Sequence, residues 1–310
     1  MPFMRCPAKL NLSLHVLGKR PDGYSTLDSV VALLDWYDAL SIRPSLCANE
    51  ASESDVHFTS NDPTLQALGE DNLVLRGIRA VQHQLRQRHP HVKGFPPVDV
   101  YLEKHLPYQA GLGSASSNAA CAIRQYHTLV CQQWSELTPL SDEQLHELGA
   151  EIGSDVPLFL KKTPLLHLQG RGEHLDVIAG NSVSFRGVDV LVLKSAHIAI
   201  STKDAYSWVH EAKAYSTPKA LLIEGLQSGL PLKALQPVMH NDFEAVVFEK
   251  HPALALHKKA LLDKGAFHAM LCGSGSAVVG FFEPDRLPSE KEQEQLQTSL
   301  GVKLWQTAFL

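Results

Sequence analysis

The sequence feature that most restricts the possible folds of this chain is a glycine- and serine-rich run in its middle. It is PYQAGLGSASSNAA, residues 107–120. Residues 98–103 before it are apolar at every second position, which predicts a strand. Ser117, Asn118 and the alanines behind them favour a helix start. A strand, a Gly/Ser loop and a helix in this order direct backbone N–H groups at an anion, so the run predicts a phosphate-binding loop.

The loop does not match the two commonest phosphate-loop patterns. A Walker A loop ends in Gly-Lys-Ser/Thr, which is absent here, and the G-x-G-x-x-G pattern fails because position 116 is serine. A tight turn that needs glycine but binds no ligand is the alternative. The segment alone leaves both interpretations open.

The length, net charge and cysteine content of the chain limit the classes of protein to which it can belong. The chain has 310 residues and a formal net charge of −5, which predicts one large or two medium domains and argues against a nucleic-acid-binding surface. The cysteine count is odd and C-x-x-C is absent, so we expect a reduced, cytoplasmic protein. The N-terminus lacks the apolar core of a signal peptide, and no apolar run is long enough to span a bilayer. We therefore expect neither nucleic acid nor membrane as a partner.

Periodicity predicts an α+β chain with mainly antiparallel sheets. Residues 9–16 alternate and predict a half-buried strand that ends at Gly18. Ser141 and Gln144 have the spacing of a capping box, as do Ser289 and Glu292. The further strands expected are 29–44, 98–103, 188–194 and 276–282, and the helices are 72–87, 141–152, 251–265 and 288–301. The best domain boundary lies near residue 165, which divides the chain into 1–165 and 166–310.

Several short motifs occur in order along nearly the whole chain. They are PAKLNLSLHVLGKRPDGY, LPYQAGLGSASSNAA, IGSDVPLFL, GRGE and LCGSGSAVVGFF. Together they resemble the GHMP family of small-molecule kinases, and within it the branch that serves isoprenoid precursor synthesis and whose substrate carries a cytidine diphosphate. The resemblance implies a two-domain GHMP kinase fold with the active site in a cleft between an N-terminal ATP-binding domain and a C-terminal domain. One motif alone is weak, but several in order are specific.

The resemblance also implies where ATP binds. The phosphate contacts expected are Pro107, Gly111, Leu112, Gly113, Ser114, Ala115, Ser116 and Ser117. Lys104 and Asn72 match positions near the adenosine. The 16 histidines show no ligand spacing, so we predict no protein metal site and expect Mg²⁺ to arrive with ATP. The expected assembly is a monomer or a weak homodimer.

Two charged residues match the catalytic positions of the family. Phosphoryl transfer needs positioning, charge neutralisation and a carboxylate near the attacking hydroxyl. By resemblance Asp155 in GSDVP is that carboxylate, and Lys9 in PAKLNL keeps it ionised and orients the alcohol. Without the family pattern, Asp155 is a turn or capping residue and Lys9 is a surface lysine.

The resemblance further implies a pocket for a cytosine ring. Tyr24 and Tyr206 match the two aromatic side chains that hold the ring, and stacking suits a flat base. Asn11, Thr202 and Asp155 match polar contacts to the substrate. The family usually carries histidine after DGY, where it contacts the cytosine edge, whereas this chain has Ser25. We expect backbone groups near Ser25, or a bridging water, to help recognise the base.

Two other functions remain open from the sequence. One is a GHMP kinase that acts on an alcohol lacking cytidine, which Ser25 permits and the two tyrosines disfavour. The other is a non-catalytic module that binds nucleotide or RNA. The presence of Lys9 and Asp155 and the acidic charge argue against it.

Overall fold

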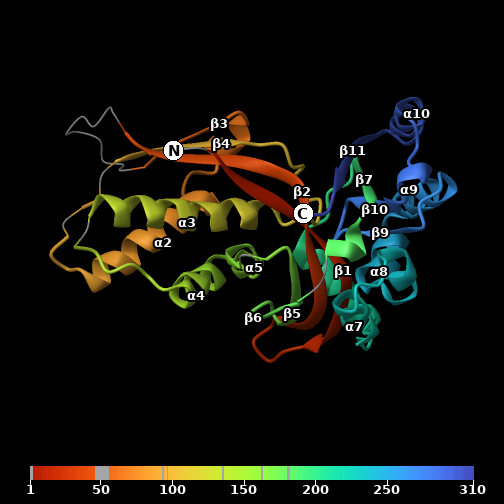
Figure 1. The fold of residues 1–310 in the computed structure, drawn as a ribbon, viewed down its shortest axis with the longest axis horizontal. Helices are drawn as coiled ribbons and strands as arrows, with labels where there is room; N and C mark the ends of the chain where they lie inside the picture. Colours follow the sequence, from red (N-terminus) through yellow and green to blue (C-terminus); the bar gives the residue numbers. More distant parts are fainter. Residues whose placement is uncertain are drawn as a thin grey trace. The chain divides into compact units, whose positions relative to one another are not determined.

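The computed structural model describes residues 3–45, 56–92, 94–95, 97–134, 136–161, 163–179, 182–218 and 220–310 (Figure 1). The chain forms two compact units that interleave in sequence. The first unit comprises Met1–Pro7, Tyr37–Leu106 and Gly113–Lys162, and the second comprises Ala8–Trp36, Pro107–Leu112 and Thr163–Leu310. Strands β1 (Met4–Lys19) and β2 (Ser25–Pro44) therefore give residues to both units. The division at residue 165 stays a prediction.

The first unit combines a small mixed sheet with helices. The C-terminal half of β2 pairs antiparallel with β4 (Val98–Glu103), and β3 (Val56–Ser60) pairs parallel with β4. The helices are α1 (Pro63–Gln66), η1 (Gly69–Asp71), α2 (Leu73–Arg88), α3 (Ser114–Gln133), α4 (Asp142–Ile152) and α5 (Val156–Leu160). In Figure 1, α2 and α3 lie side by side. Gly77 permits this close packing, because a Cβ there would lie 3.2 Å from the carbonyl oxygen of Ala119.

Helix α3 begins earlier than predicted. The expected start near Ser117 and Asn118 is wrong, because Gly113 is the N-cap and the helix begins at Ser114. Gly113 has a φ of +70°, a left-handed conformation that glycine adopts without steric cost. The loop therefore ends at Gly113, and Ser114 and Ser116 belong to the first helical turn.

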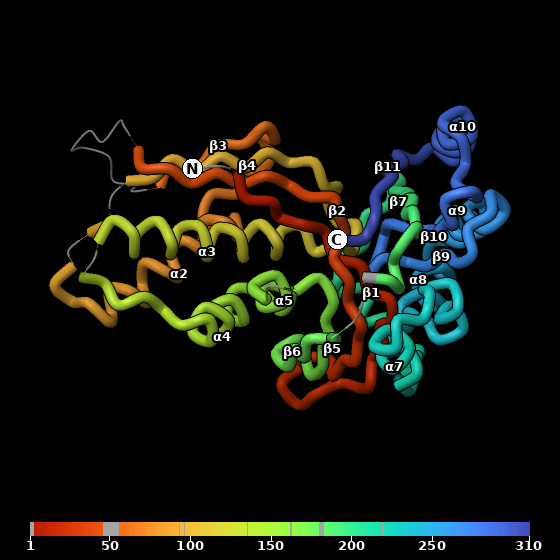
Figure 2. The backbone as a smooth tube through the Cα atoms, viewed as in Figure 1, coloured from red at the N-terminus to blue at the C-terminus, as the bar shows by residue number. Residues whose placement is uncertain are grey.

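The second unit contains a four-stranded antiparallel sheet in the order β11–β7–β10–β9. These strands are Val302–Ala308, Asp189–Ser195, Val278–Phe282 and His268–Leu271. In the same unit β2 pairs antiparallel with β5 (Leu165–Gly170), β5 pairs with β6 (His174–Val177), and β1 pairs parallel with β8 (His240–Asn241). The helices are η2 (Ser182–Phe185), α6 (Thr202–Ala212), α7 (Leu221–Gln227), η3 (Leu232–Val238), α8 (Phe243–Lys250), α9 (Pro252–Asp263), η4 (Pro284–Arg286) and α10 (Glu290–Leu300). Figure 2 traces residues 163–310 of this unit from green to blue.

Strand β1 departs from the predicted half-buried pattern. Both of its faces are buried: Leu10 and Leu12 on one, Asn11 and Ser13 on the other. The polar face can be covered because its groups are hydrogen-bonded, and Asn11 Nδ2 donates to Ser29 Oγ at 2.8 Å. The strand also continues past Gly18 to Lys19.

The two predicted helix starts are confirmed. Both predicted capping boxes are formed, at the start of α4 and of α10. Cys6, Cys121, Cys131 and Cys272 carry free thiols, and Cys47 lies outside the described residues. Within the described part of the chain, none of the helices has both the length and the apolar content to cross a bilayer.

Candidate functional site

The first half of the glycine-rich loop packs against the GSGS turn inside the second unit. Gly111 has a φ of +76°, and a Cβ there would lie only 1.8 Å from the carbonyl oxygen of Cys272. The backbone N–H of Ser276 donates to the carbonyl of Gln109 at 3.1 Å. Two backbone segments thus meet without an intervening side chain, so packing by itself requires glycine at position 111.

The second half of the loop forms the N-terminus of a long helix. Helix α3 has 20 residues, and within the described chain its N-cap makes no side-chain capping bond. Ser117 Oγ is fully buried and has no hydrogen-bond partner among the described residues. Unpaired N–H groups, the positive end of the helix dipole and an unpaired hydroxyl suit a phosphate group. The side chains present therefore fit the phosphates of ATP.

The GSDVP motif lies beside this helix start. A Cβ on Gly153 would lie 4.0 Å from Ser116 Oγ. Asp155 occupies the N-cap position of α5, yet among the described residues its side chain accepts no capping bond. Asp155 therefore lies in a turn at the N-cap position, and its catalytic role stays a prediction.

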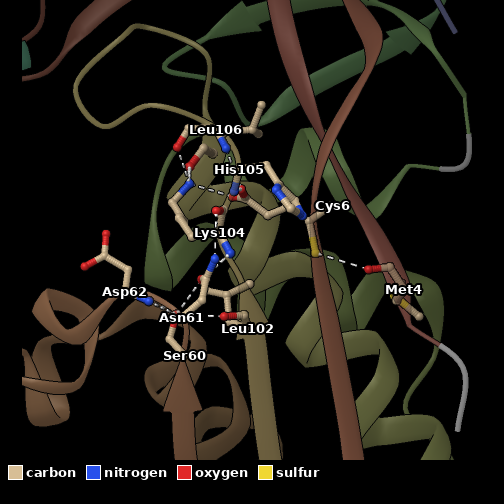
Figure 3. Close-up of polar contacts among 11 residues, drawn as sticks. Met4, Cys6, Ser60, Asn61, Asp62, Leu102, Lys104, His105 and Leu106 are labelled. Carbon is tan, nitrogen blue, oxygen red and sulfur yellow. Dashed lines mark hydrogen bonds and ion pairs between the residues drawn. The ribbon is translucent and has the colours of Figure 1, made fainter.

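Lys104 is held inside the first unit, as Figure 3 shows. Its Nζ donates to Asp38 Oδ2 at 2.6 Å, to the carbonyl of Leu106 at 2.8 Å and to Ser114 Oγ at 2.6 Å. Asp38 is fully buried and also accepts the N–H groups of His105 and Leu106. Burial lowers the pKa of Lys104, and the charge of Asp38 acts in the opposite direction. Lys104 thus ties the end of β4 to the start of α3.

The polypeptide around Lys104 is fixed by a second set of bonds (Figure 3). The Lys104 N–H donates to Asn61 Oδ1 at 2.7 Å, and Asn61 Nδ2 returns a bond to the Lys104 carbonyl at 3.2 Å. Asn72, the other residue predicted near the adenosine, is the N-cap of α2 and accepts from the N–H of Val74 at 3.0 Å. Both residues have structural roles, and their contact with adenosine stays a prediction.

Lys9 is buried, so the surface-lysine alternative is wrong. Its Nζ donates to Asn11 Oδ1 at 2.7 Å, and its N–H donates to the carbonyl of Leu112 at 2.9 Å. A Cβ on Gly273 would lie 3.2 Å from Lys9 Nζ and 3.5 Å from Asn11 Oδ1. The structure therefore brings Lys9 and Asn11 together with Leu112 of the loop and the GSGS turn in the second unit. Asp155 belongs to the first unit, and its pairing with Lys9 stays a prediction.

One predicted stacking residue, Tyr24, presents an open aromatic face. Tyr24 is 53 % exposed, and Arg171 Cζ of the GRGE motif lies 5.1 Å from its ring centre. Glu173 accepts from the N–H of Arg171 at 2.5 Å and from Arg20 at 3.3 Å, which joins the GRGE turn to the RPDGY turn. The guanidinium of Arg171 lies over the tyrosine ring, and the stacking role of Tyr24 stays a prediction.

Tyr206, on α6, lies in a cluster with polar groups of the same unit. It packs edge-on against Phe243, and its ring centre is 6.4 Å from that of His210. His210 Nε2 is 2.9 Å from Ser25 Oγ, so the residue that departs from the family pattern contacts an imidazole from another element. Thr202 Oγ1 lies 3.4 Å from Ser274 Oγ in the GSGS turn. Sequence reasoning missed His210, and its i+4 spacing from Tyr206 was the signal available.

Three side chains of types that can bind a metal ion lie close together, although the spacing of the histidines in the sequence predicted no metal site. Ligand atoms of His15, His240 and Asp242 all lie within 4.8 Å of one another. Asp242 Oδ1 is 2.6 Å from His240 Nε2, and its Oδ2 accepts the N–H of Val16 at 2.6 Å. Burial raises the pKa of Asp242, but these hydrogen bonds outweigh it and lower the pKa overall. The carboxylate thereby fastens β8 to β1, a structural role.

Comparisons with known proteins show the family of this chain. Residues 72–162 match the model of the GHMP kinases N terminal domain, and residues 222–301 match that of the GHMP kinases C terminal domain. A 4-diphosphocytidyl-2-C-methyl-D-erythritol kinase of Prosthecochloris aestuarii is 34% identical over 97% of this chain and 96% of its own. One of Salinibacter ruber is 35% identical over 91% of each chain.

A solved structure supports the fold. A crystal structure of 4-(cytidine 5'-diphospho)-2C-methyl-D-erythritol kinase matches with a TM-score of 0.72 and 24% identity, covering 99% of this chain and 98% of that one. The predicted α+β GHMP kinase fold and the predicted resemblance are both confirmed. The chain belongs to the 4-diphosphocytidyl-2-C-methyl-D-erythritol kinase family of the GHMP kinases.

Proposed function

We propose that this chain transfers the γ-phosphoryl group of ATP to the 2-hydroxyl of 4-diphosphocytidyl-2-C-methyl-D-erythritol. Relatives with this name match the chain over nearly its full length. The observation that carries the proposal is the buried Lys9–Asn11 pair beside Gly273 in the GSGS turn. A surface lysine would need no such arrangement, whereas a lysine that acts on a bound alcohol must be held in one place.

The ATP phosphates would be held at the start of α3. Gly113 leaves the N–H groups of the first turn open, and Ser117 supplies a buried hydroxyl. Lys104 binds Ser114 and so keeps this turn in position. In phosphoryl transfer, the Mg²⁺ that binds with ATP would neutralise part of the phosphate charge. The protein itself contributes positioning and hydrogen-bond donors.

Asp155 and Lys9 would act on the alcohol. The carboxylate of Asp155 accepts the hydroxyl proton as the oxygen attacks phosphorus. The ammonium of Lys9 favours the ionised form of that carboxylate and orients the alcohol oxygen. Asn11 holds Lys9 Nζ at 2.7 Å and limits its freedom. Tyr24 and Tyr206 would enclose the cytosine ring.

An ATP-consumption assay with a panel of acceptor alcohols tests the proposal. The purified full chain is given the cytidine diphosphate substrate, its parent alcohol without the nucleotide, mevalonate and homoserine, each with Mg²⁺-ATP. We expect turnover with the cytidine substrate only. If the protein phosphorylates only a non-nucleotide alcohol, the proposed function is replaced by that of a GHMP kinase with another substrate. A chain that binds ATP but phosphorylates none of them would favour the non-catalytic module.

A further inference from the structure

Three side chains of the second unit form a hydrogen-bonded chain, which we term the relay: Tyr215, His210 and Ser25. Tyr215 OH lies 2.9 Å from His210 Nδ1, and His210 Nε2 lies 2.9 Å from Ser25 Oγ. We propose that the relay fixes the Ser25 hydroxyl as a hydrogen-bond donor and thereby makes the site select cytosine over uracil. This inference rests on the proposed function.

The relay joins the two segments that carry the stacking tyrosines. Ser25 directly follows Tyr24, and His210 lies one helical turn after Tyr206 on α6. The rings of His210 and Tyr206 are inclined by only 29° to one another. The proposal places the edge of a base held by the two tyrosines against the relay. In the family resemblance an imidazole follows DGY, whereas here helix α6 supplies it.

The turn at the end of α6 positions the third member of the relay. Lys213 is the C-cap of α6 and has a φ of +50°, in the left-handed region. The N–H of Ala214 donates to the carbonyl of Val209 at 3.0 Å, which closes the helix end and turns the chain back. Tyr215 is thereby brought to His210. The turn sets the backbone position of Tyr215, whose side chain is exposed.

The chemistry of the three groups gives the relay a direction. A neutral imidazole has one donor and one acceptor nitrogen, and the groups it bonds select the tautomer. Burial and the nearby charge of Lys19 lower the pKa of His210, which keeps the ring neutral. A phenol is more acidic than a serine hydroxyl and is the stronger donor, so Tyr215 donates to Nδ1. His210 Nε2 then carries the proton and donates to Ser25 Oγ, which leaves the Ser25 hydrogen for a ligand.

A fixed donor distinguishes the two pyrimidines. Cytosine presents the acceptor N3 at the middle of its edge, whereas uracil presents an N–H at the same place. The Ser25 hydroxyl donates to the first. Facing the second, it can only accept, with its remaining lone pair, and its own hydrogen is left without a partner. Ser25 is only 8 % exposed, so water does not readily replace the missing bond. We expect a preference of about tenfold or more for cytosine, the scale for leaving a buried polar group unpaired.

The test measures kcat/KM for the cytidine substrate and for its uridine counterpart, and compares their ratio among variants. Tyr215→Phe removes the donor to Nδ1, frees the tautomer and should lower the ratio toward one. Ser25→Ala should lower the cytidine-to-uridine ratio to the same value. The double variant Ser25→Ala/Tyr215→Phe should lower the ratio no further. His210→Gln, whose amide N–H can donate to Ser25, should keep more of the ratio than His210→Leu. Tyr101→Phe, in β4 of the first unit, is the control.

The outcomes separate the relay from the proposed function. A wild-type ratio in Tyr215→Phe and Ser25→Ala, with kinase activity intact, overturns the relay and leaves the proposed function standing. Additive losses in the double variant also overturn it. If the wild-type chain phosphorylates neither pyrimidine substrate but accepts a simple alcohol, the proposed function itself fails. Thermal unfolding of each variant shows whether a lost ratio arises from a folded protein.

Discussion

The Nζ atom of Lys104 lies 2.6 Å from Oδ2 of Asp38, and both side chains are buried in the first unit. Such a pair is costly to desolvate, so its value lies in the geometry that it imposes. Here it joins the strand end of β4 to the first turn of α3 through Ser114. Lys104, which was predicted to lie near the adenosine, is thus part of the frame that holds the first turn of α3.

Replacing Lys104 with methionine should destabilise the protein strongly. The substitution leaves the Asp38 carboxylate buried without its cation, and breaking such pairs costs about 3–5 kcal/mol. Urea unfolding measures the loss. Lys104→Met combined with Asp38→Asn should recover part of it, because the uncompensated charge is gone. Lys233→Met, which breaks an exposed pair with Glu283, is the control and should cost about 1 kcal/mol or less. Equal effects of the two lysine variants would contradict the structural role.

Gly111→Ala should be far more harmful than Gly301→Ala. Both glycines have left-handed φ values, +76° and +61°, so both substitutions carry backbone strain. Only at Gly111 does the new Cβ meet backbone, the carbonyl of Cys272 at 1.8 Å, whereas nothing lies within 4 Å of a Cβ on Gly301. The difference in melting temperature between the two variants measures the clash. Similar melting temperatures would show that the loop and the GSGS turn can separate freely.

Ser117→Ala should move stability and ATP affinity in opposite directions. The Ser117 hydroxyl is buried and unpartnered among the described residues, so its removal should stabilise the ligand-free protein by about 1 kcal/mol. If the hydroxyl binds a phosphate, ATP affinity should fall by about tenfold, which calorimetry measures. Ser184 in η2 carries another buried hydroxyl without a partner among the described residues, and Ser184→Ala is the control, whose ATP affinity should not change. Unchanged ATP affinity in Ser117→Ala would remove this residue from the phosphate site.

Asp155→Asn should abolish most turnover without unfolding the protein. The amide keeps the shape of the side chain and removes the charge that would receive the hydroxyl proton. We expect kcat to fall by about 100-fold or more, the usual scale for a positioned acid–base group. Asp285→Asn, at an exposed carboxylate in η4, should leave kcat unchanged. Near-full turnover in Asp155→Asn, with chemistry rate-limiting, would refute the assignment.

The His167–Asp28 pair should stabilise the protein in a limited pH window. The hydrogen bond that His167 donates to Asp28 raises the pKa of His167 above 6.5, so the contribution of His167 to stability is full below pH 6.5 and is lost as pH rises through the raised value. Burial raises the pKa of Asp28, but bonds from His167 and Gln169 outweigh it and lower the pKa below 3.8. That contribution is lost only as pH falls through the lowered value.

His167→Gln should therefore cost more stability near pH 5.5 than near pH 8.5, measured by denaturant unfolding at each pH. His57→Gln changes an exposed histidine whose Nδ1 is 3.9 Å from Asp99 and serves as the control. A loss for His167→Gln that is independent of pH would show that the charged form of the pair contributes nothing.

Local features of this protein follow directly from its sequence. The two capping boxes, at Ser141 and at Ser289, need only residues three positions apart, and both form as expected. Alternation over 98–103 and over 276–282 predicts strands that the structure contains. These signals are reliable because the interacting groups are neighbours along the chain. The ordered motifs likewise indicated the kinase family.

Tertiary structure alone decided the features that depend on distant segments. Asn11 and Ser13 look like a solvent-facing row, yet β1 is covered on both faces. His210 becomes a partner of Ser25 only because helix α6 lies against the start of β2 in the folded unit. Lys104 and Asp38, 66 positions apart, form an ion pair that no local pattern reveals. The periodicity of apolar residues shows which side chains lie on each face of a single helix or strand. Packing between segments that are far apart in the sequence decides which element buries those groups. No local pattern in the sequence reports which distant segments will pack together.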